Sequence, residues 1–190
     1  MIDRLAAGIS YQIYKKQIFN HTQIREIQYG LQAFISETIK IFFMCILLVL
    51  TGHLKYGLFA MLVFSSLRIW AGGYHANTYV RCFILSLSII YVSVLAGLHV
   101  QSDFLFIIQA LFSFGIILKF SPAEHKNQPI ISKERRKKIH TIALITFIFW
   151  TGISYILPLP WKYIGMNAVF IETLTITYMI LSEKILEYKK

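Results

Sequence analysis

Long runs of residues without a charge are the feature that most constrains how this chain can fold. Residues 83–102 and 139–161 each form an uncharged run of about 20 residues or more, enough to cross a hydrocarbon core of about 30 Å at 1.5 Å per residue. Residues 163–182 have a similar length and contain one charge, and residues 104–118 form a shorter run. Each of these four runs therefore predicts a membrane-spanning helix.

Two runs nearer the start, residues 41–54 and 56–67, leave an alternative open. They hold 14 and 12 residues between charges, a length that also fits re-entrant or interfacial segments. The composition favours a membrane protein in either case, because charged residues make up only 15% of the chain, whereas about 25% is usual in soluble domains. We predict an all-α integral membrane protein with about six transmembrane helices, which argues against a soluble enzyme, a disordered chain or a nucleic-acid-binding module.

Basic residues are distributed unevenly among the segments that connect these runs. With the N-terminus in the cytoplasm, 17 of the 19 Lys and Arg residues fall in the cytoplasmic segments, which are residues 1–40, 68–82, 119–138 and 183–190. Lys55 and Lys162 alone would face outward. Because basic residues accumulate in cytoplasmic loops, both termini and the segment around Cys82 are expected in the cytoplasm.

A single polytopic domain is expected over residues 1–190. Residues 1–38 carry apolar residues at near-helical spacing with basic residues between them, a pattern typical of amphipathic helices on the inner leaflet. A soluble amphipathic helix packed on the cytosolic face fits that pattern equally. Residues 39–182 are then expected to hold the transmembrane helices, with a basic cytoplasmic loop at residues 119–138.

The segment of residues 68–82 combines reactive and polar residues at the end of an apolar run. It contains His75 and Cys82, and an imidazole that accepts the thiol proton is the minimal apparatus for a cysteine nucleophile. Residues seven apart lie about 10.5 Å apart along a straight helix, whereas a hydrogen bond spans about 3 Å. The chain must therefore bend between the two residues, at Asn77 or Thr78, unless this is an ordinary interfacial loop with an incidental cysteine.

The pattern Arg68-x4-Gly73-x-His75-x6-Cys82 resembles the accessory gene regulator B family, which are bacterial membrane cysteine peptidases that process autoinducing peptide precursors in quorum sensing. The resemblance extends to residues 121–130, to the basic run at residues 133–138, to the chain length and to the six-span layout. It implies that Cys82 is the nucleophile, that His75 is its base and that Arg68 and Gly73 have supporting roles. It also implies that the enzyme cleaves the C-terminal part from a pro-peptide and closes a thiolactone or lactone through a thioester on Cys82.

Glu172 is a further candidate for a supporting role. It lies in the middle of the last span, where an ionisable group is costly and by default indicates a function and a partner. Arg68, His75 or a neutral hydroxyl could be that partner. The alternative is a structural glutamate that is protonated or hydrogen bonded.

The basic run at residues 133–138 also has two interpretations. It can anchor the orientation of the chain on anionic lipid. The family resemblance suggests that it also docks the acidic part of a precursor peptide. Its basic residues are Lys133, Arg135, Arg136, Lys137 and Lys138.

These features together predict a multi-pass protein of the bacterial cell membrane with its active site on the cytoplasmic side. The expected partners are a short precursor peptide and anionic membrane lipid, without nucleic acid, and a homodimer is a candidate assembly. No metal or cofactor is expected, because the sequence lacks an HExxH or CxxC motif and a carboxylate cluster. The alternative functions are a small transporter or channel subunit without peptidase activity and a structural membrane scaffold.

Overall fold

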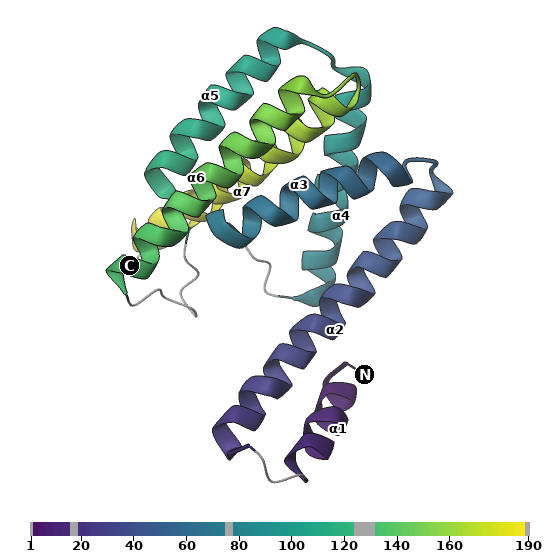
Figure 1. The fold of residues 1–190 in the computed structure, drawn as a ribbon, viewed down its shortest axis with the longest axis vertical. Coiled ribbons are helices and arrows are strands. Elements are labelled where there is room, and N and C mark those ends of the chain that lie inside the picture. The colour runs from purple at the N-terminus through teal and green to yellow at the C-terminus, as the bar shows by residue number, and fades with distance from the viewer. Residues whose placement is uncertain (1, 16–18, 75–77, 124–131, 189–190) are drawn as a thin grey trace. The chain divides into compact units, whose positions relative to one another are not determined.

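The computed structural model of this protein describes residues 2–15, 19–74, 78–123 and 132–188, with the side chains that fall within residues 6–182 of these ranges. In these ranges the chain forms seven α-helices and no β-strand (Figure 1). In chain order the helices are α1 (Ile2–Tyr14), α2 (His21–Leu50), α3 (Leu54–Ala71), α4 (Tyr79–His99), α5 (Asp103–Phe120), α6 (Lys133–Ile156) and α7 (Trp161–Tyr188). Internal contacts divide the chain into two compact units, Met1–Thr51 and Gly52–Lys190. The single polytopic domain over residues 1–190 stays a prediction.

Six of the helices in the described residues, α2 to α7, are long and apolar enough to cross a membrane. This confirms the predicted all-α fold with about six spans. The first short run, residues 41–54, covers the end of α2 and the connection to α3, and the second, residues 56–67, lies within α3; the two helices hold 30 and 18 residues. Even the shorter helix extends about 27 Å at 1.5 Å per residue. The side of the membrane on which each terminus lies stays a prediction.

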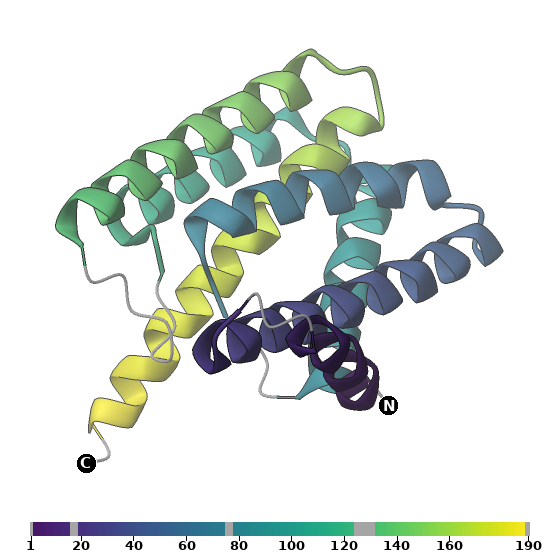
Figure 2. The ribbon, with the colours of Figure 1, turned by 60° about the horizontal axis from the view of Figure 1, so that its bottom comes forward.

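The first unit is a pair of helices in which α1 packs along α2 (Figures 1 and 2). A capping box begins α2: the Asn20 side chain accepts the Gln23 N–H at 2.9 Å, and the Gln23 side chain accepts the Asn20 N–H at 3.0 Å. The helix then runs to Leu50 without a break at residue 38. The amphipathic region and the first span, which the sequence pattern separated, therefore share one helix. Glu37 and Lys40 form an ion pair of 2.6 Å on this helix.

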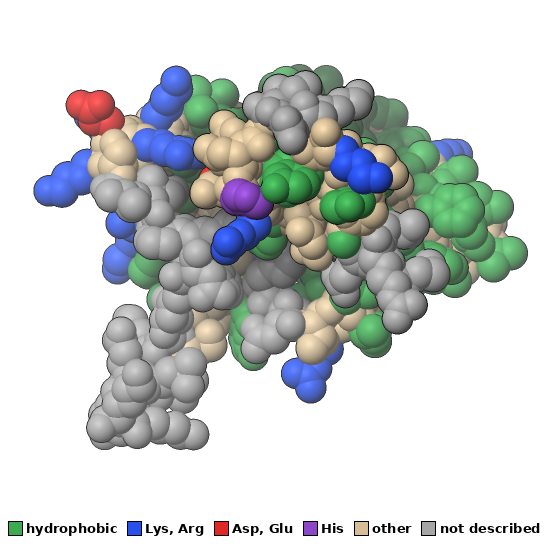
Figure 3. Space-filling model, turned by 90° about the horizontal axis from the view of Figure 1, so that it is seen from below, with side chains coloured by type: hydrophobic (Ala, Val, Ile, Leu, Met, Phe, Trp, Pro, Cys, Tyr) green, Lys and Arg blue, Asp and Glu red, His purple; other side chains and the backbone are tan. Residues whose placement is uncertain are grey.

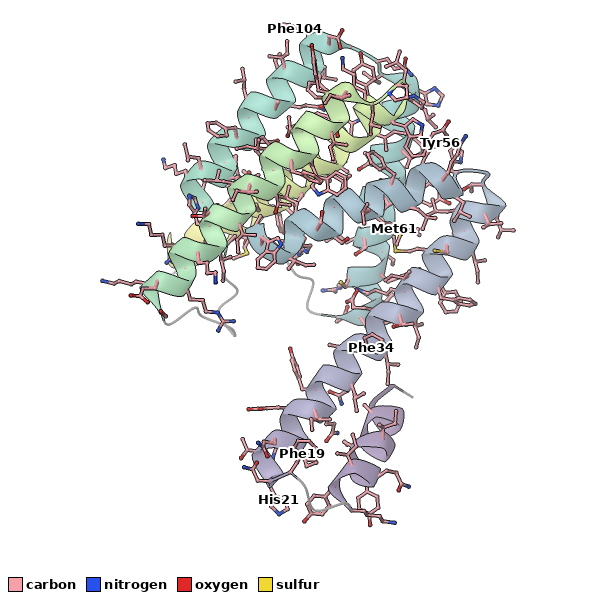
Figure 4. The ribbon with its side chains drawn as sticks, in the orientation of Figure 1. Phe19, His21, Phe34, Tyr56, Met61 and Phe104 are labelled. Carbon is pink, nitrogen blue, oxygen red and sulfur yellow. The ribbon has the colours of Figure 1, made fainter. Side chains whose placement is uncertain are left out.

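In the second unit α7 is the central helix. It packs against α3, α4, α5 and α6, and Figures 1 and 2 both show it passing between α3 and α6. Of its span, 61% is buried, against 22–28% in each of these four helices. The surrounding helices turn apolar side chains outward, as Phe104 does at the start of α5 (Figure 4). An apolar exterior around a packed central helix suits a lipid environment.

Polar side chains inside the second unit are paired between α5 and α7. The Gln109 amide donates to the Asn167 side chain at 2.9 Å, and the hydroxyls of Ser113 and Thr173 lie 3.1 Å apart. Lipid tails are as apolar as leucine, so apolar side chains alone do little to select which helices associate. Interhelical hydrogen bonds such as these therefore specify which faces of α5 and α7 meet.

An ion pair ties α5 to α7 at the first turns of both helices. Lys162 Nζ lies 2.5 Å from Asp103 Oδ1, and the Tyr163 hydroxyl donates to the same oxygen at 3.1 Å. The ammonium also lies 4.8–5.6 Å from the ring centroids of Phe106, Tyr155 and Tyr163, which places it in reach of cation–π attraction. One of the two lysines that the charge pattern assigns to the outer face thus pairs with a neighbouring helix.

Small residues let α7 approach its neighbours closely. A Cβ atom added at Gly97 of α4 would lie 2.6 Å from Ile164 N and 2.8 Å from Ile164 Cα. A Cβ atom added at Gly165 would overlap the Ser154 hydroxyl of α6. Glycine is common at such helix interfaces in membranes because it allows backbones to meet.

We predict that Gly97→Ala lowers the stability of the protein, because the new methyl group must separate α4 from α7. Overpacking of this kind costs about 1–3 kcal/mol. The measurement is the thermal or denaturant-induced unfolding midpoint of the purified protein in detergent micelles.

The matched control is Gly152→Ala in α6, where an added Cβ atom meets nothing within 4 Å. The control should be neutral or stabilising by up to about 1 kcal/mol, since alanine favours helix. Equal midpoints for the two variants would contradict the close α4–α7 contact.

Candidate functional site

Arg68 and Glu172 form an ion pair between the last turn of α3 and the middle of α7. Glu172 is fully buried, and Arg68 Nη1 lies 3.2 Å from each of its carboxylate oxygens. The same Nη1 donates to the Thr175 hydroxyl at 3.0 Å, and that hydroxyl lies 3.2 Å from Glu172 Oε2. We call these three residues the Arg68 cluster. A buried charge is tolerated where it is paired and hydrogen bonded, and the Arg68 cluster meets both conditions.

The chain that leaves α3 lies directly on the Arg68 cluster. Arg68 Nη2 donates to the Tyr74 carbonyl oxygen, and the Tyr74 N–H donates to the Thr175 carbonyl at 3.4 Å. The Tyr74 ring meets the Tyr178 ring edge to face, with centroids 4.9 Å apart. Both the backbone and the side chain of Tyr74 are therefore fixed to α7.

Gly73 fits this site because it has no side chain. A Cβ atom there would lie 2.6 Å from Thr175 Oγ1, 2.8 Å from Arg68 Nη1 and 3.1 Å from Glu172 Oε1. Its φ of +130° is also a conformation that other residues rarely adopt. The Arg68 cluster thus encloses the backbone at Gly73.

On its other side the same chain segment meets the residues that follow α5. The Ala123 N–H donates to the Ala71 carbonyl at 2.8 Å, and Gly72 and Ala123 form an isolated parallel bridge. A Cβ atom at Gly72 would overlap the Ala123 carbonyl oxygen. His140 Nδ1 of α6 lies 2.7 Å from the Ser121 carbonyl oxygen. Residues 72–74 therefore lie between α7 and the segment of residues 121–123.

Cys82 lies in the first turn of α4. Thr78 precedes this helix in an extended conformation, and its side chain accepts the Arg81 N–H. The Cys82 N–H donates to the Thr78 carbonyl at 2.9 Å, and its side chain is half-buried. Since α4 begins at Tyr79, the helix that carries Cys82 does not continue back through Thr78. His75 and Asn77 lie outside the described residues. Both Cys82 and Cys45 are thiols.

The predicted basic loop at residues 119–138 divides differently in the structure. Its last six residues, 133–138, form the start of α6, where Ser132 caps the helix by accepting the Arg135 N–H at 3.4 Å. The side chains of the run are all exposed. Figure 3 shows Lys and Arg side chains gathered on the left of the face seen from below, where α6 begins. A rigid helix rather than a loop therefore displays the basic residues Lys133, Arg135, Arg136, Lys137 and Lys138.

The structure brings three of the sequence-predicted site residues together: Arg68, Gly73 and Glu172. Sequence reasoning missed Thr175, although its position three residues after Glu172 places it on the same face of a helix. It also missed the bond of His140, for which the sequence holds no signal. In the described part of the chain no group of three or more His, Cys, Asp or Glu residues is arranged to hold a metal ion.

Known proteins resemble this chain over most of its length. The model of the accessory gene regulator B family matches residues 6–181. The chain is 27% identical to accessory gene regulator protein B of Staphylococcus intermedius, over 93% of this chain and 94% of that protein. It is 25% identical to accessory gene regulator protein B of Staphylococcus aureus (strain MRSA252), over 86% and 88%. An AgrB-like protein of Clostridium beijerinckii is 24% identical, over 93% and 88%. No solved structure matches the chain.

We predict that Glu172→Ala strongly destabilises the second unit, because it leaves the Arg68 guanidinium without its carboxylate. Removing one partner of a buried pair costs about 3–5 kcal/mol, and the lower end is expected because the Arg68 side chain is 24% exposed. The unfolding midpoint in detergent micelles measures this effect.

Glu134→Ala is the control, since Glu134 is exposed in the first turn of α6. Its loss should cost no more than about 1 kcal/mol, the usual contribution of an acidic residue at a helix start. A Glu172→Ala protein as stable as this control would show that the ion pair does not hold α3 against α7.

Proposed function

The chain belongs to the accessory gene regulator B family, and from this we propose that it is a membrane-embedded cysteine endopeptidase that cleaves and cyclises a quorum-sensing pro-peptide. Its multi-pass membrane character agrees with that assignment. In the proposal Cys82 is the nucleophile and His75 is the base that activates it. The reaction needs no cofactor.

The first half of the proposed reaction removes the C-terminal part of the pro-peptide. The Cys82 thiol gives its proton to His75, and Sγ attacks the carbonyl carbon of the scissile peptide bond. The tetrahedral intermediate collapses as the C–N bond breaks, and His75 returns the proton to the departing amine. The N-terminal part of the peptide stays attached to Cys82 as a thioester.

The second half closes the ring. A Cys or Ser side chain within the bound peptide loses its proton to the base and attacks the thioester carbonyl. The bond to Cys82 breaks, the Cys82 thiol forms again, and the product is a thiolactone or a lactone. Water must be kept from the thioester during this step, and a site at the edge of the membrane helps to exclude it.

The fixed position of Gly73 and Tyr74 on the Arg68 cluster is the observation that carries this proposal. The cluster holds the backbone up to the residue directly before His75. The motif residues Arg68 and Gly73 then have a common purpose, which is to define where the chain that bears His75 begins. Glu172 supports the same arrangement by pairing with Arg68.

The stabilisation of the oxyanion is assigned here to the backbone. Arg68 directs Nη1 and Nη2 to acceptors within the protein. Among the backbone N–H groups of residues 75–82, those of Arg81 and Cys82 donate to Thr78, so the proposed donors to the developing negative charge precede Arg81 in the chain. A helix N-terminus favours negative charge because its first N–H groups point outward without helical partners.

The basic start of α6 is the proposed docking surface for the acidic part of the pro-peptide. Its charges are exposed on a rigid helix, which supports binding of an anionic partner, and anionic lipid remains a partner of the same surface. The active site and this surface are proposed to face the cytoplasm, where 17 of the 19 basic residues would lie. A homodimer stays a candidate assembly.

We predict that Cys82→Ala abolishes pro-peptide cleavage, by at least about 10³-fold, because loss of a nucleophile removes the covalent pathway. His75→Ala should have a similar effect. Cleavage is measured by mass spectrometry on membranes that contain the protein and a synthetic pro-peptide.

Cys45→Ala is the matched control and should cleave normally. Cleavage that survives Cys82→Ala would contradict the assigned nucleophile. An absence of cleavage by the unaltered chain would instead favour the transporter or channel interpretation.

We also predict that replacing the five basic residues of the run with Gln raises KM about tenfold with little change in kcat, since each exposed ion pair contributes about 0.2–1 kcal/mol. The residues are Lys133, Arg135, Arg136, Lys137 and Lys138. Kinetics and the membrane orientation of the variant are measured together. Inverted orientation without a separate loss of affinity would show that the run acts as an anchor alone.

A further inference from the structure

A short segment after α5 connects α6 to the backbone that precedes His75. Ser121 is held by α6, because His140 Nδ1 lies 2.7 Å from its carbonyl oxygen. Two residues later, the Ala123 N–H donates to the Ala71 carbonyl at 2.8 Å. We call Ser121–Ala123 the clasp.

The bond at His140 has a defined direction. A backbone carbonyl oxygen can only accept a hydrogen bond, so Nδ1 of His140 must carry the hydrogen. Both the tautomer protonated at Nδ1 and the doubly protonated ring meet this requirement. An asparagine side chain can place an amide N–H at the position of Nδ1, whereas a glutamine places it one bond further out.

The clasp and the Arg68 cluster contact the backbone of residues 71–74 from opposite sides. Ala123 pairs with Gly72 in a parallel bridge, and the Tyr74 N–H donates to α7. Consecutive Cα atoms lie about 3.8 Å apart, so any shift of Tyr74 moves the origin of the His75 side chain. Removal of the clasp would leave residues 72–74 supported by Arg68 of α3 and by α7 alone.

We propose that His140 is a positioning residue for the reaction, which acts through the clasp on the backbone that leads to His75. This inference rests on the proposed function. His140 lies two residues after Lys138 on α6, so the docking surface for the pro-peptide and the support of His75 share one rigid helix. The clasp then keeps the position of the docked peptide constant relative to the catalytic base.

The test compares His140→Ala, His140→Asn and His140→Gln in the full-length protein in membranes. Hydrogen–deuterium exchange of the peptides that cover residues 71–74 and 121–123 reports the clasp directly and does not depend on catalysis. The alkylation rate of Cys82 in a Cys45→Ala background reports the thiol and its base. Cleavage kinetics with a synthetic pro-peptide report the reaction.

His140→Ala should speed exchange in both peptides, slow the alkylation of Cys82 and lower kcat about tenfold to a hundredfold, because a misplacement of about 1 Å can cost up to 10²-fold. KM should change little, since the docking surface is intact. His140→Asn should recover most of the protection and of kcat, whereas His140→Gln should resemble His140→Ala.

Three results would overturn the inference. One is that His140→Ala leaves the hydrogen–deuterium exchange of both peptides unchanged. Another is a faster exchange that leaves kcat and alkylation unaltered. The third is equal behaviour of the Asn and Gln variants. If His140→Ala does not fold, the exchange and kcat of His140→Asn compared with those of His140→Gln still test the inference. Failure of the proposed function is read separately, from cleavage that survives Cys82→Ala.

Discussion

The fold of the second unit depends on the ion pair between Arg68 and Glu172, because the buried carboxylate needs a partner. Glu172 is fully buried in α7, and a carboxylate in a low-dielectric interior is strongly unfavourable unless a partner supplies opposite charge and hydrogen bonds. Arg68 supplies both, and it can do so only if the last turn of α3 lies against the middle of α7. The same guanidinium reaches the Tyr74 carbonyl. The path of the chain beyond α3 therefore follows from the requirement of one side chain.

Irregular backbone at the edge of a membrane has the same requirement on a smaller scale. Where a helix ends, carbonyl and N–H groups lose their helical partners, and in lipid each such group is costly unless the protein satisfies it. Residues 71–74 meet this condition through the Ala123 N–H, the Arg68 guanidinium and the Thr175 carbonyl. This segment can be irregular because Arg68 of α3, α7 and residues 121–123 provide its partners.

The spans could be predicted from the sequence because runs of uncharged residues reflect the solvent and not the tertiary contacts. The start of α6 was not predicted, since hydropathy assigned the charged run to a connector, although Lys, Arg and Glu are good helix formers and Ser132 is a good cap. In the site, Arg68 and Glu172 stood out as rare charges among apolar residues. Thr175 and His140 did not, because hydroxyls and histidines are common near spans and their partners lie far away in sequence.

The position of α7 in the order of the chain has a consequence for synthesis. Arg68 and Glu172 are 104 positions apart, so at about 5–20 residues per second the arginine leaves the ribosome roughly 5–20 s before its partner. Until then α3 to α6 lack the helix around which they pack, and Gly73 and Tyr74 have no surface to lie on. The contacts that fix Gly73 and Tyr74 therefore form only after α7 has been made.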